Sequence, residues 1–420
     1  MPEFLTEFIV DLNTKSKRIL ENFEDKKINK FYENKFKAHW IDYQLDSCIP
    51  EQDVIAIDSS RGRCPTSNGG FFFVCRALAL GKKNKYRTIF TDFDFSNIMT
   101  QSTFIGRVME WTEHLAGIQA IEKQFKGILL IDGSLYGRMA HLPLELKLEN
   151  NKGFILDYFE IYLKLLKLCK EKGILLIGIS KESRTSFYRE FLIKEILKEK
   201  ISDKKLRKRL LSEALDRPKN AFKLAKSIGD KDIILLTEEL IARKPDSLLI
   251  LSNAEDSGFT KPLLLGASTR WRRAGKLIRT NFRQFIESNF PTLSEDPDFI
   301  KHAQKIIFEM LDFPAVISFH ILPTRIDTPM RIDIPAWYFD INKRLLDIGW
   351  PKLIDIDLNE VLELISAGYC GLENFNIWLT AVDNEVKLSR VDFEELYLKK
   401  FEEIIGKKAT PRGYRRVRYP

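Results

Sequence analysis

Two short apolar segments that each lead into an aspartate constrain the fold of this chain more than any other feature. The first is Val54–Asp58 (Val-Ile-Ala-Ile-Asp), and the second is Gly127–Leu135 (Gly-Ile-Leu-Leu-Ile-Asp-Gly-Ser-Leu), which contains Asp132. Short apolar runs bounded by turn residues are typical of strands that are buried on both faces. We expect each aspartate at the last residue of its strand, followed by a turn of small polar residues and glycine. A single aspartate in this setting usually caps the turn, but two copies indicate a site.

The elements around these two strands predict one mixed β-sheet. In chain order they are the strand ending at Asp58, strands Phe71–Leu80 and Tyr86–Phe95, a helix within Phe104–Phe125, the Asp132 strand, helix Gly153–Lys172 and strand Gly173–Lys181. Short turns between the first three strands predict an antiparallel meander. The later alternation of helix and strand predicts parallel βα units, so the fold class is α/β with flanking helices.

The remaining chain divides by composition. We expect an N-terminal helical segment (residues 1–50), the first part of the core (51–187), a charged helical insertion (188–245), the rest of the domain with its closing helices (246–405) and a basic tail (406–420). Two further strands are predicted at Val316–Leu322 and Met330–Ile334, and the closing helices are predicted at Glu373–Val382 and Val391–Ile405.

Charge and cysteine usage limit the functional classes. The 420 residues carry a net charge of +8, which favours an anionic partner, with nucleic acid ahead of a membrane surface. The five cysteines show no CxxC spacing, so neither a zinc site nor a disulfide framework is predicted. The start of the sequence lacks a secretory signal pattern, and no apolar run approaches a membrane span. These features predict a cytoplasmic protein.

The predicted topology brings carboxylates together. The first and fourth strands should lie side by side, which places Asp58 near Asp132. Glu110 and Glu113 lie three residues apart on the intervening helix, and either could supply a third carboxylate. Such an all-oxygen site suits Mg²⁺ or Mn²⁺ and not Zn²⁺. Two ions roughly 3.5–4 Å apart are the usual device for cleaving a phosphodiester in line.

Several motifs together resemble one family. They are Ile55-Ala-Ile-Asp58-Ser-Ser, Met109–Gly117, Leu129-Leu-Ile-Asp132-Gly-Ser-Leu, Ile177-Gly-Ile-Ser-Lys181-Glu-Ser183, Asp246-Ser-Leu-Leu-Ile, Gly258-Phe-Thr-Lys-Pro-Leu, Arg331-Ile-Asp-Ile-Pro and Ala381–Leu388. In this order they are similar to NurA, a family of prokaryotic DNA repair nucleases with a ribonuclease-H-like fold. The resemblance covers roughly residues 50–400.

The resemblance assigns metal ligands. Asp58 and Asp132 match the family's strand carboxylates, and Glu113 matches the helix glutamate better than Glu110, because small residues follow it at the expected places. The family often has Ala-His near the C-terminus, where this chain has Val-Asp, so Asp383 is the expected final ligand. His320 is an alternative if its segment folds back over the site.

Phosphate contacts are expected from basic and hydroxyl side chains. Lys181 and Ser183 lie at the end of the fifth strand, near both aspartates, where a lysine can hold a phosphate as a point charge. Arg61 and Arg63 follow Asp58 closely. The segment Arg270–Arg283 mixes cations with aromatic residues, which is typical of a strip that contacts a nucleic acid backbone; its site candidates are Arg270, Arg272 and Arg273.

The resemblance implies a deoxyribonuclease that uses two Mn²⁺ ions per active site, with Mg²⁺ as an alternative. It further implies 5′→3′ exonuclease and endonuclease action on single-stranded DNA, with duplex DNA as an additional candidate substrate. The implied partners are a second copy of the chain and a hexameric HerA-type ATPase, acting together in DNA end resection. The sequence has no Gly-x-x-x-x-Gly-Lys-Ser/Thr loop, so ATP-driven movement would come from that partner. The alternatives are a non-catalytic DNA-binding subunit and another ribonuclease-H-like enzyme, such as a resolvase or a ribonuclease.

Overall fold

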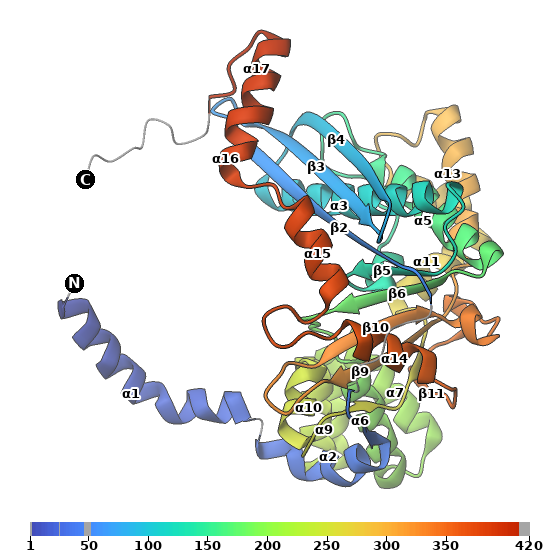
Figure 1. The fold of residues 1–420 in the computed structure, drawn as a ribbon. Coiled ribbons are helices and arrows are strands. Elements are labelled where there is room, and N and C mark those ends of the chain that lie inside the picture. Colours follow the sequence, from blue (N-terminus) through green and yellow to red (C-terminus); the bar gives the residue numbers. More distant parts are fainter. Residues whose placement is uncertain (1, 25, 46–51, 411–420) are drawn as a thin grey trace.

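The fold is built around one mixed sheet with helices on both faces (Figure 1). We analysed a computed structural model that describes residues 2–24, 26–45 and 52–410. The strand order is β1-β7-β9-β10-β6-β5-β2-β3-β4, and β8 joins β9 and β11 beside this path. The strands are β1 Trp40–Asp42, β2 Val54–Pro65, β3 Gly70–Leu80, β4 Lys85–Phe95, β5 Ile128–Asp132, β6 Leu175–Ser180, β7 Gly258–Thr260, β8 Leu263–Leu265, β9 Val316–Leu322, β10 Met330–Pro335 and β11 Lys352–Leu353.

The helices cover both faces of the sheet, and some of them form a second lobe beside it. They are α1 Pro2–Glu24, α2 Lys26–His39, α3 Ile98–Glu122, α4 Leu135–Met139, α5 Phe154–Lys172, α6 Phe187–Lys200, α7 Lys204–Asp216, α8 Pro218–Ile228, α9 Lys231–Ala242, α10 Asp246–Asn253, α11 Thr269–Thr280, α12 Phe282–Asn289, α13 Pro297–Met310, α14 Asn359–Gly368, α15 Ile377–Val386, α16 Arg390–Asp392 and α17 Lys399–Ile405. None of the helices in the described ranges is long and apolar enough to cross a membrane.

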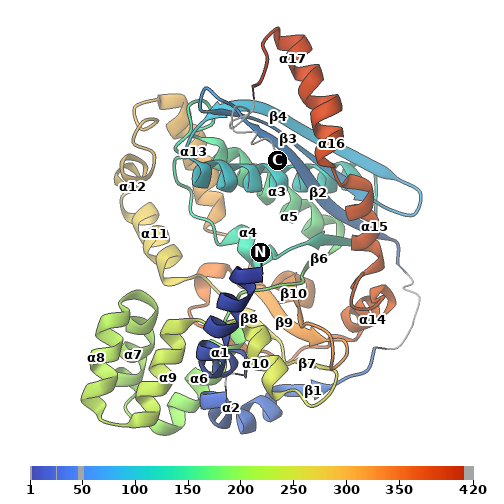
Figure 2. The same cartoon turned by 90° about the vertical axis from the view of Figure 1, so that its left-hand side faces the viewer.

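The predicted sheet topology is confirmed. Strands β2, β3 and β4 form an antiparallel meander, and β2, β5 and β6 run parallel to one another. The predicted later strands are β9 and β10, and they continue the sheet: β10 pairs antiparallel with β6, and β9 pairs antiparallel with β10. Residues 188–245 are helical as predicted, and α7, α8 and α9 form a lobe beside the sheet (Figure 2).

The predicted end of the first strand is wrong. Strand β2 does not turn after Asp58 but continues to Pro65, and every residue from Asp58 to Pro65 pairs with β3. The Ser-Ser-Arg-Gly sequence suggests a turn locally. The apolar run Gly70–Leu80 provides a long partner strand, and this pairing overrides the local preference. Asp58 therefore lies inside a strand and not at its end.

Successive side chains of β2 and β5 point to opposite faces of the sheet and so enter two different hydrophobic cores. Ile57 and Ile131 face the core that includes α3 and α5, whereas Ala56 and Leu130 face the core that includes α14 and α15. Because side chains alternate with a period of two, Asp58 and Asp132 both belong to the face that α15 covers. The sheet is the rigid element that positions both carboxylates.

The C-terminal predictions differ in detail. The basic strip Arg270–Arg283, whose conformation was not predicted, forms α11 and the start of α12. The predicted closing helix Glu373–Val382 is α15, which begins at Ile377 and ends at Val386. Most of the predicted basic tail, residues 411–420, lies outside the described residues.

Candidate metal centre

The two strand aspartates lie opposite each other on adjacent parallel strands. The register pairs Ala56 with Leu130 and Ile57 with Ile131. When the same register is extended by one residue, Asp58 lies opposite Asp132. Strand β5 ends at Asp132, whereas β2 continues, so the sheet opens beside Asp58. Both aspartates are partly buried. The opening gives solvent and ligand access to two rigidly held carboxylates.

Helix α15 brings Asp383 to the same face. Burial is the main cause that raises the pKa of Asp58 and Asp132, and the charge of Asp383 adds to the rise in both, so Asp383 acts on both strands. The end of α15 is tied to the meander, because Arg76 donates from Nε to the Val386 carbonyl at 2.8 Å and from Nη2 to the Lys387 carbonyl at 2.8 Å. The Ser60 hydroxyl also donates to the Val386 carbonyl. These contacts fix the C-terminal helix over β2.

Glu113 reaches the site from α3 on the opposite face. It is buried, and its carboxylate accepts hydrogen bonds from the Ser59 hydroxyl and from Nη2 of Arg138. Arg138 is also buried, and its Nη2 donates to the Asp132 carbonyl oxygen at 3.1 Å. Its Nη1 lies 2.9 Å from Nε2 of His114. Arg138 therefore links the helix glutamate to the strand that carries Asp132.

Glu110 belongs to a different cluster. The Tyr158 hydroxyl donates to its Oε2 at 2.6 Å, and Arg107 and His141 lie 3.5 and 3.6 Å from the same oxygen. Burial alone would raise the pKa of Glu110, but the His141 hydrogen bond and the Arg138 and Arg107 charges hold it below its ordinary range. Of the two helix glutamates, Glu113 is the one next to Asp58.

The turn after Asp132 is held by a residue that sequence reasoning did not assign to the site. Asp333 on β10 is buried, and its Oδ2 accepts hydrogen bonds from the Ser134 hydroxyl at 2.6 Å and from the Tyr136 amide at 3.2 Å. Arg331 lies 2.8 Å from its Oδ1. The Arg-Ile-Asp motif thus supports the Asp-Gly-Ser turn across the sheet. Arg138, Ser59 and Arg76 were also missed.

Burial and the charges of neighbouring acids shift the pKa values of the acidic residues. Burial, followed by the charges of Glu113 and Asp132, raises the pKa of Asp58 to about 8. Burial also raises the pKa of Asp132, although the Lys181 ammonium opposes this shift, and burial raises the pKa of Glu113 against the pull of Arg138. Carboxylates that repel one another at a solvent-open point of a sheet are stabilised by a bound cation. Perturbation of this kind is typical of functional sites.

The carboxylate side chains of the site have the chemistry that a hard cation requires, although they are not arranged to coordinate one. The candidate donors on Asp58, Asp132, Asp383 and Glu113 are all carboxylate oxygens, which matches the preference of Mn²⁺ and Mg²⁺. Across the described ranges, no three histidine, cysteine, aspartate or glutamate side chains are close enough to bind one metal ion as they stand. The Glu113 carboxylate is held by Arg138 and Ser59. Ion binding would therefore require movement of these side chains.

The predicted phosphate-binding residues are only partly near the acids. Lys181 directly follows β6, and its Nζ lies 3.3 Å from Oδ2 of Asp132 and 3.9 Å from the Phe375 ring centre. The Ser183 hydroxyl instead bonds the Thr185 hydroxyl at 2.8 Å. Arg61 and Arg63 lie further along β2, where they line a pocket together with side chains from the segment Leu388–Leu398. Lys181 is thus in direct contact with one of the two aspartates, Asp132.

The other candidates lie away from the acids. Arg270, Arg272 and Arg273 are exposed on α11, where Arg273 pairs with Asp216 at 2.8 Å. His320 is buried on β9, which β10 and β6 separate from β5, and its Nε2 lies 3.9 Å from Asp246. The segment that carries His320 therefore does not fold back over the site.

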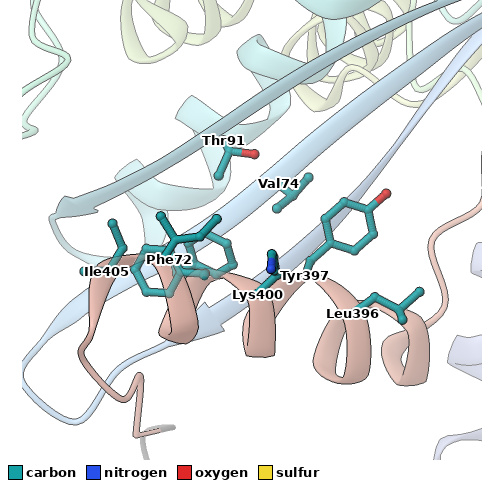
Figure 3. A pocket seen from close by; sticks show the side chains of 9 residues that line it. Phe72, Val74, Thr91, Leu396, Tyr397, Lys400 and Ile405 are labelled. Atoms are coloured by element: carbon teal, nitrogen blue, oxygen red, sulfur yellow. The ribbon is translucent and has the colours of Figure 1, made fainter.

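A separate apolar groove lies where the C-terminal helices pack on β3 and β4 (Figure 3). Its volume is about 550 Å³, and Phe72 stacks on Phe401 inside it with ring centres 4.1 Å apart. The lining residues are Phe72, Val74, Thr91, Leu396, Tyr397, Lys400, Phe401, Ile404 and Ile405. The groove has no lining carboxylate and is distinct from the acid site.

The raised pKa of Asp58 predicts a pH-dependent stability in the absence of metal. Its folded pKa of about 8 exceeds the ordinary value of 3.8, so its contribution is complete below pH 4 and is lost as the pH rises toward 8. With EDTA present, we expect Asp58→Asn to raise the free energy of unfolding at pH 8.5 by on the order of 2 kcal/mol, and to have little effect at pH 4. Urea unfolding at both pH values measures this difference. Parallel pH profiles for both proteins would contradict it.

Comparisons with known proteins identify the family and the fold of this chain. The family model described as "NurA domain" matches residues 52–388. The crystal structure of the NurA nuclease from Sulfolobus solfataricus has a TM-score of 0.53 and 12% identity, covering 97% of this chain and 98% of that chain. Its likeness confirms the predicted ribonuclease-H-like sheet.

Two other NurA crystal structures, which contain manganese, are also similar. The structure with manganese has 16% identity, a TM-score of 0.42 and coverage of 95% of this chain and 99% of that chain. The structure bound to dAMP and manganese has 15% identity, a TM-score of 0.41 and coverage of 92% and 96%. No curated protein matches this chain.

Proposed function

Because the chain belongs to the NurA family of nucleases, we propose that it is a Mn²⁺-dependent deoxyribonuclease that acts on single-stranded DNA. The main support for this proposal is that Asp58 lies opposite Asp132, where β5 ends and the sheet opens beside β2. The proposed activities are 5′→3′ exonuclease and endonuclease cleavage, in the context of DNA end resection. Mg²⁺ is the alternative cofactor.

Each acidic residue has a proposed role in holding the metal. Asp58 and Asp132 would hold the two ions, and Asp383 and Glu113 would complete their ligands from the two faces of the sheet. Bound Mn²⁺ supplies Lewis-acid stabilisation of the phosphate and lowers the pKa of water. Arg138 orients Glu113 through its ion pair and opposes the rise of the Glu113 pKa that burial causes, and Asp333 holds the turn that presents Asp132.

The substrate assignment is tested by a panel of labelled nucleic acids. Single-stranded, duplex and branched DNA and RNA are incubated with Mn²⁺ or with EDTA, and the products are separated on denaturing gels. We expect products from single-stranded DNA with Mn²⁺ and none with EDTA. Binding without cleavage would support the alternative of a non-catalytic subunit. Preferential cleavage of RNA or branched DNA would support a ribonuclease or a resolvase.

Lys181 is proposed to contact the phosphate next to the scissile bond. A charge-assisted hydrogen bond of this kind contributes about 1.5–3 kcal/mol, so Lys181→Met should lower kcat/KM about 10- to 100-fold. With EDTA present, it should reduce the salt slope of DNA binding by about 1. Lys126→Met is the matched control, because Lys126 is exposed near the opposite end of β5. Equal salt slopes for the two variants would exclude a phosphate contact at Lys181.

We also propose that the chain forms a homodimer and binds a HerA-type ATPase. Helix α1 extends away from the rest of the molecule (Figure 1) and exposes a series of apolar side chains. These are Phe4, Leu5, Phe8, Ile9 and Val10. Contiguous exposed apolar surface usually marks a site of protein association. Light scattering of the chain alone, and mixed with the ATPase, measures both assemblies.

A further inference from the structure

A cationic pocket lies between α6, α7 and α11, outside the acid site. Its volume is about 390 Å³. The lining residues are Lys194, Lys198, Lys204, Arg207, Lys208, Leu211, Ser212, Leu215, Thr269, Arg272, Gly349 and Trp350. None of them belongs to β2, β5, α3 or α15, which carry the acids. In Figure 2, α11 lies next to the lobe that contains α7. The pocket is therefore separate from the acid site and lies where the helical insertion meets α11 and residues 349–350.

The lining contains six cations and no carboxylate. Lys198 pairs with Glu195 at 2.6 Å, but the structure gives Lys204 and Lys208 no carboxylate partner within the described ranges. The Lys194 Nζ donates to the Pro351 carbonyl at 3.4 Å, and burial together with the Lys198 charge lowers the pKa of Lys194. Like charges gathered around one concavity repel one another, and a bound anion relieves this repulsion.

The rest of the lining adds directional donors and an aromatic surface. The Thr269 and Ser212 hydroxyls line the pocket. Arg272 donates from Nη2 to Thr269 at 3.3 Å, which orients its guanidinium at the first turn of α11. Trp350 is partly buried, and its Nε1 is buried without a hydrogen-bond partner. A guanidinium fork suits phosphate oxygens, and an indole ring suits a stacked base.

We propose that this pocket binds a nucleotide through its phosphate groups, with the base against Trp350. Several cations around a concave site match a ligand that bears clustered negative charge, and the volume matches that of small-molecule sites. The same chemistry is present in a free nucleoside diphosphate and in the 5′-phosphorylated end of a DNA strand. The proposal does not depend on the nuclease activity, because the pocket shares no residue with the acid site.

Calorimetry in EDTA tests the site, because chelation prevents metal-mediated phosphate binding at the acids. ADP, pyrophosphate, and oligo(dT) with a 5′-phosphate or a 5′-hydroxyl are titrated into the wild type. We expect Lys204→Ala/Lys208→Ala to weaken ADP binding at least about tenfold, since two charge-assisted contacts are lost. The control Lys219→Ala/Lys223→Ala removes two exposed lysines of α8 and should leave binding unchanged. Trp350→Phe should weaken ADP binding and leave pyrophosphate binding unchanged.

The outcomes separate the sources of the ligand. Tighter binding of ADP than of either oligonucleotide identifies a free nucleotide, and a preference for the 5′-phosphorylated oligonucleotide identifies a strand end. Failure of the wild type to bind any of these ligands at millimolar concentration would overturn the proposal, as would equal losses in the two double variants. Binding of a polyglutamate peptide as tight as that of ADP would also overturn it. ADP binding by a protein that cleaves no DNA would contradict only the proposed nuclease function.

Discussion

Asp58→Asn and Asp132→Asn should each reduce Mn²⁺-dependent DNA cleavage by on the order of 10³-fold or more. Each substitution removes the charge of a carboxylate that would hold an ion but keeps the size of the side chain. The two residues lie opposite each other on β2 and β5, so neither can replace the other. Initial rates on labelled single-stranded DNA across a range of Mn²⁺ concentrations measure the loss.

The matched control is Asp53→Asn. Asp53 is exposed and directly precedes β2, so it tests the effect of removing a carboxylate from the same segment. We expect near wild-type cleavage from this variant. Circular dichroism and DNA binding in EDTA should be unchanged in all three proteins. Wild-type cleavage by either Asp58→Asn or Asp132→Asn would refute the assignment of these residues.

Arg138→Met should destabilise the metal-free protein by about 3–5 kcal/mol. The guanidinium is buried and pairs with the buried Glu113, so its removal leaves an uncompensated carboxylate in a low-dielectric setting. It also removes the donors to His114 and to the Asp132 carbonyl. Urea unfolding in EDTA measures the change in the free energy of unfolding.

Two variants separate lost charge compensation from lost packing. Arg138→Met/Glu113→Gln should recover a large part of the loss, because no buried charge remains unpaired. Arg107→Met, in the half-buried pair with Glu110, should cost less than Arg138→Met. A loss below about 1 kcal/mol for Arg138→Met would contradict the role given to this ion pair.

Local sequence patterns contained enough information to predict the core of the site. Strand β5 and the first part of β2 are short apolar runs with little competing preference, and their parallel pairing follows from the order of the elements. The face that carries both aspartates then follows from strand alternation. Lys181 was predicted near the aspartates because it follows the neighbouring strand, and its contact with Asp132 agrees with that placement.

The parts that sequence reasoning missed depend on contacts between distant segments. Asp333 holds the Ser134 turn from 199 residues away, and no local pattern signals this contact. Arg138 lies on α4, a five-residue helix too short to show periodicity, although its place after the Asp-Gly-Ser turn was a usable signal. The continuation of β2 past Asp58 depends on pairing with β3, which outweighs the turn preference of its own residues.

The most direct test of the central claim is anomalous scattering from a crystal soaked in Mn²⁺. The account predicts Mn²⁺ density in contact with both the Asp58 and Asp132 carboxylates, at the open point between β2 and β5, and its loss in the Asp58→Asn protein. Crystals of active protein that bind Mn²⁺ elsewhere, with no density between these two carboxylates, would contradict it.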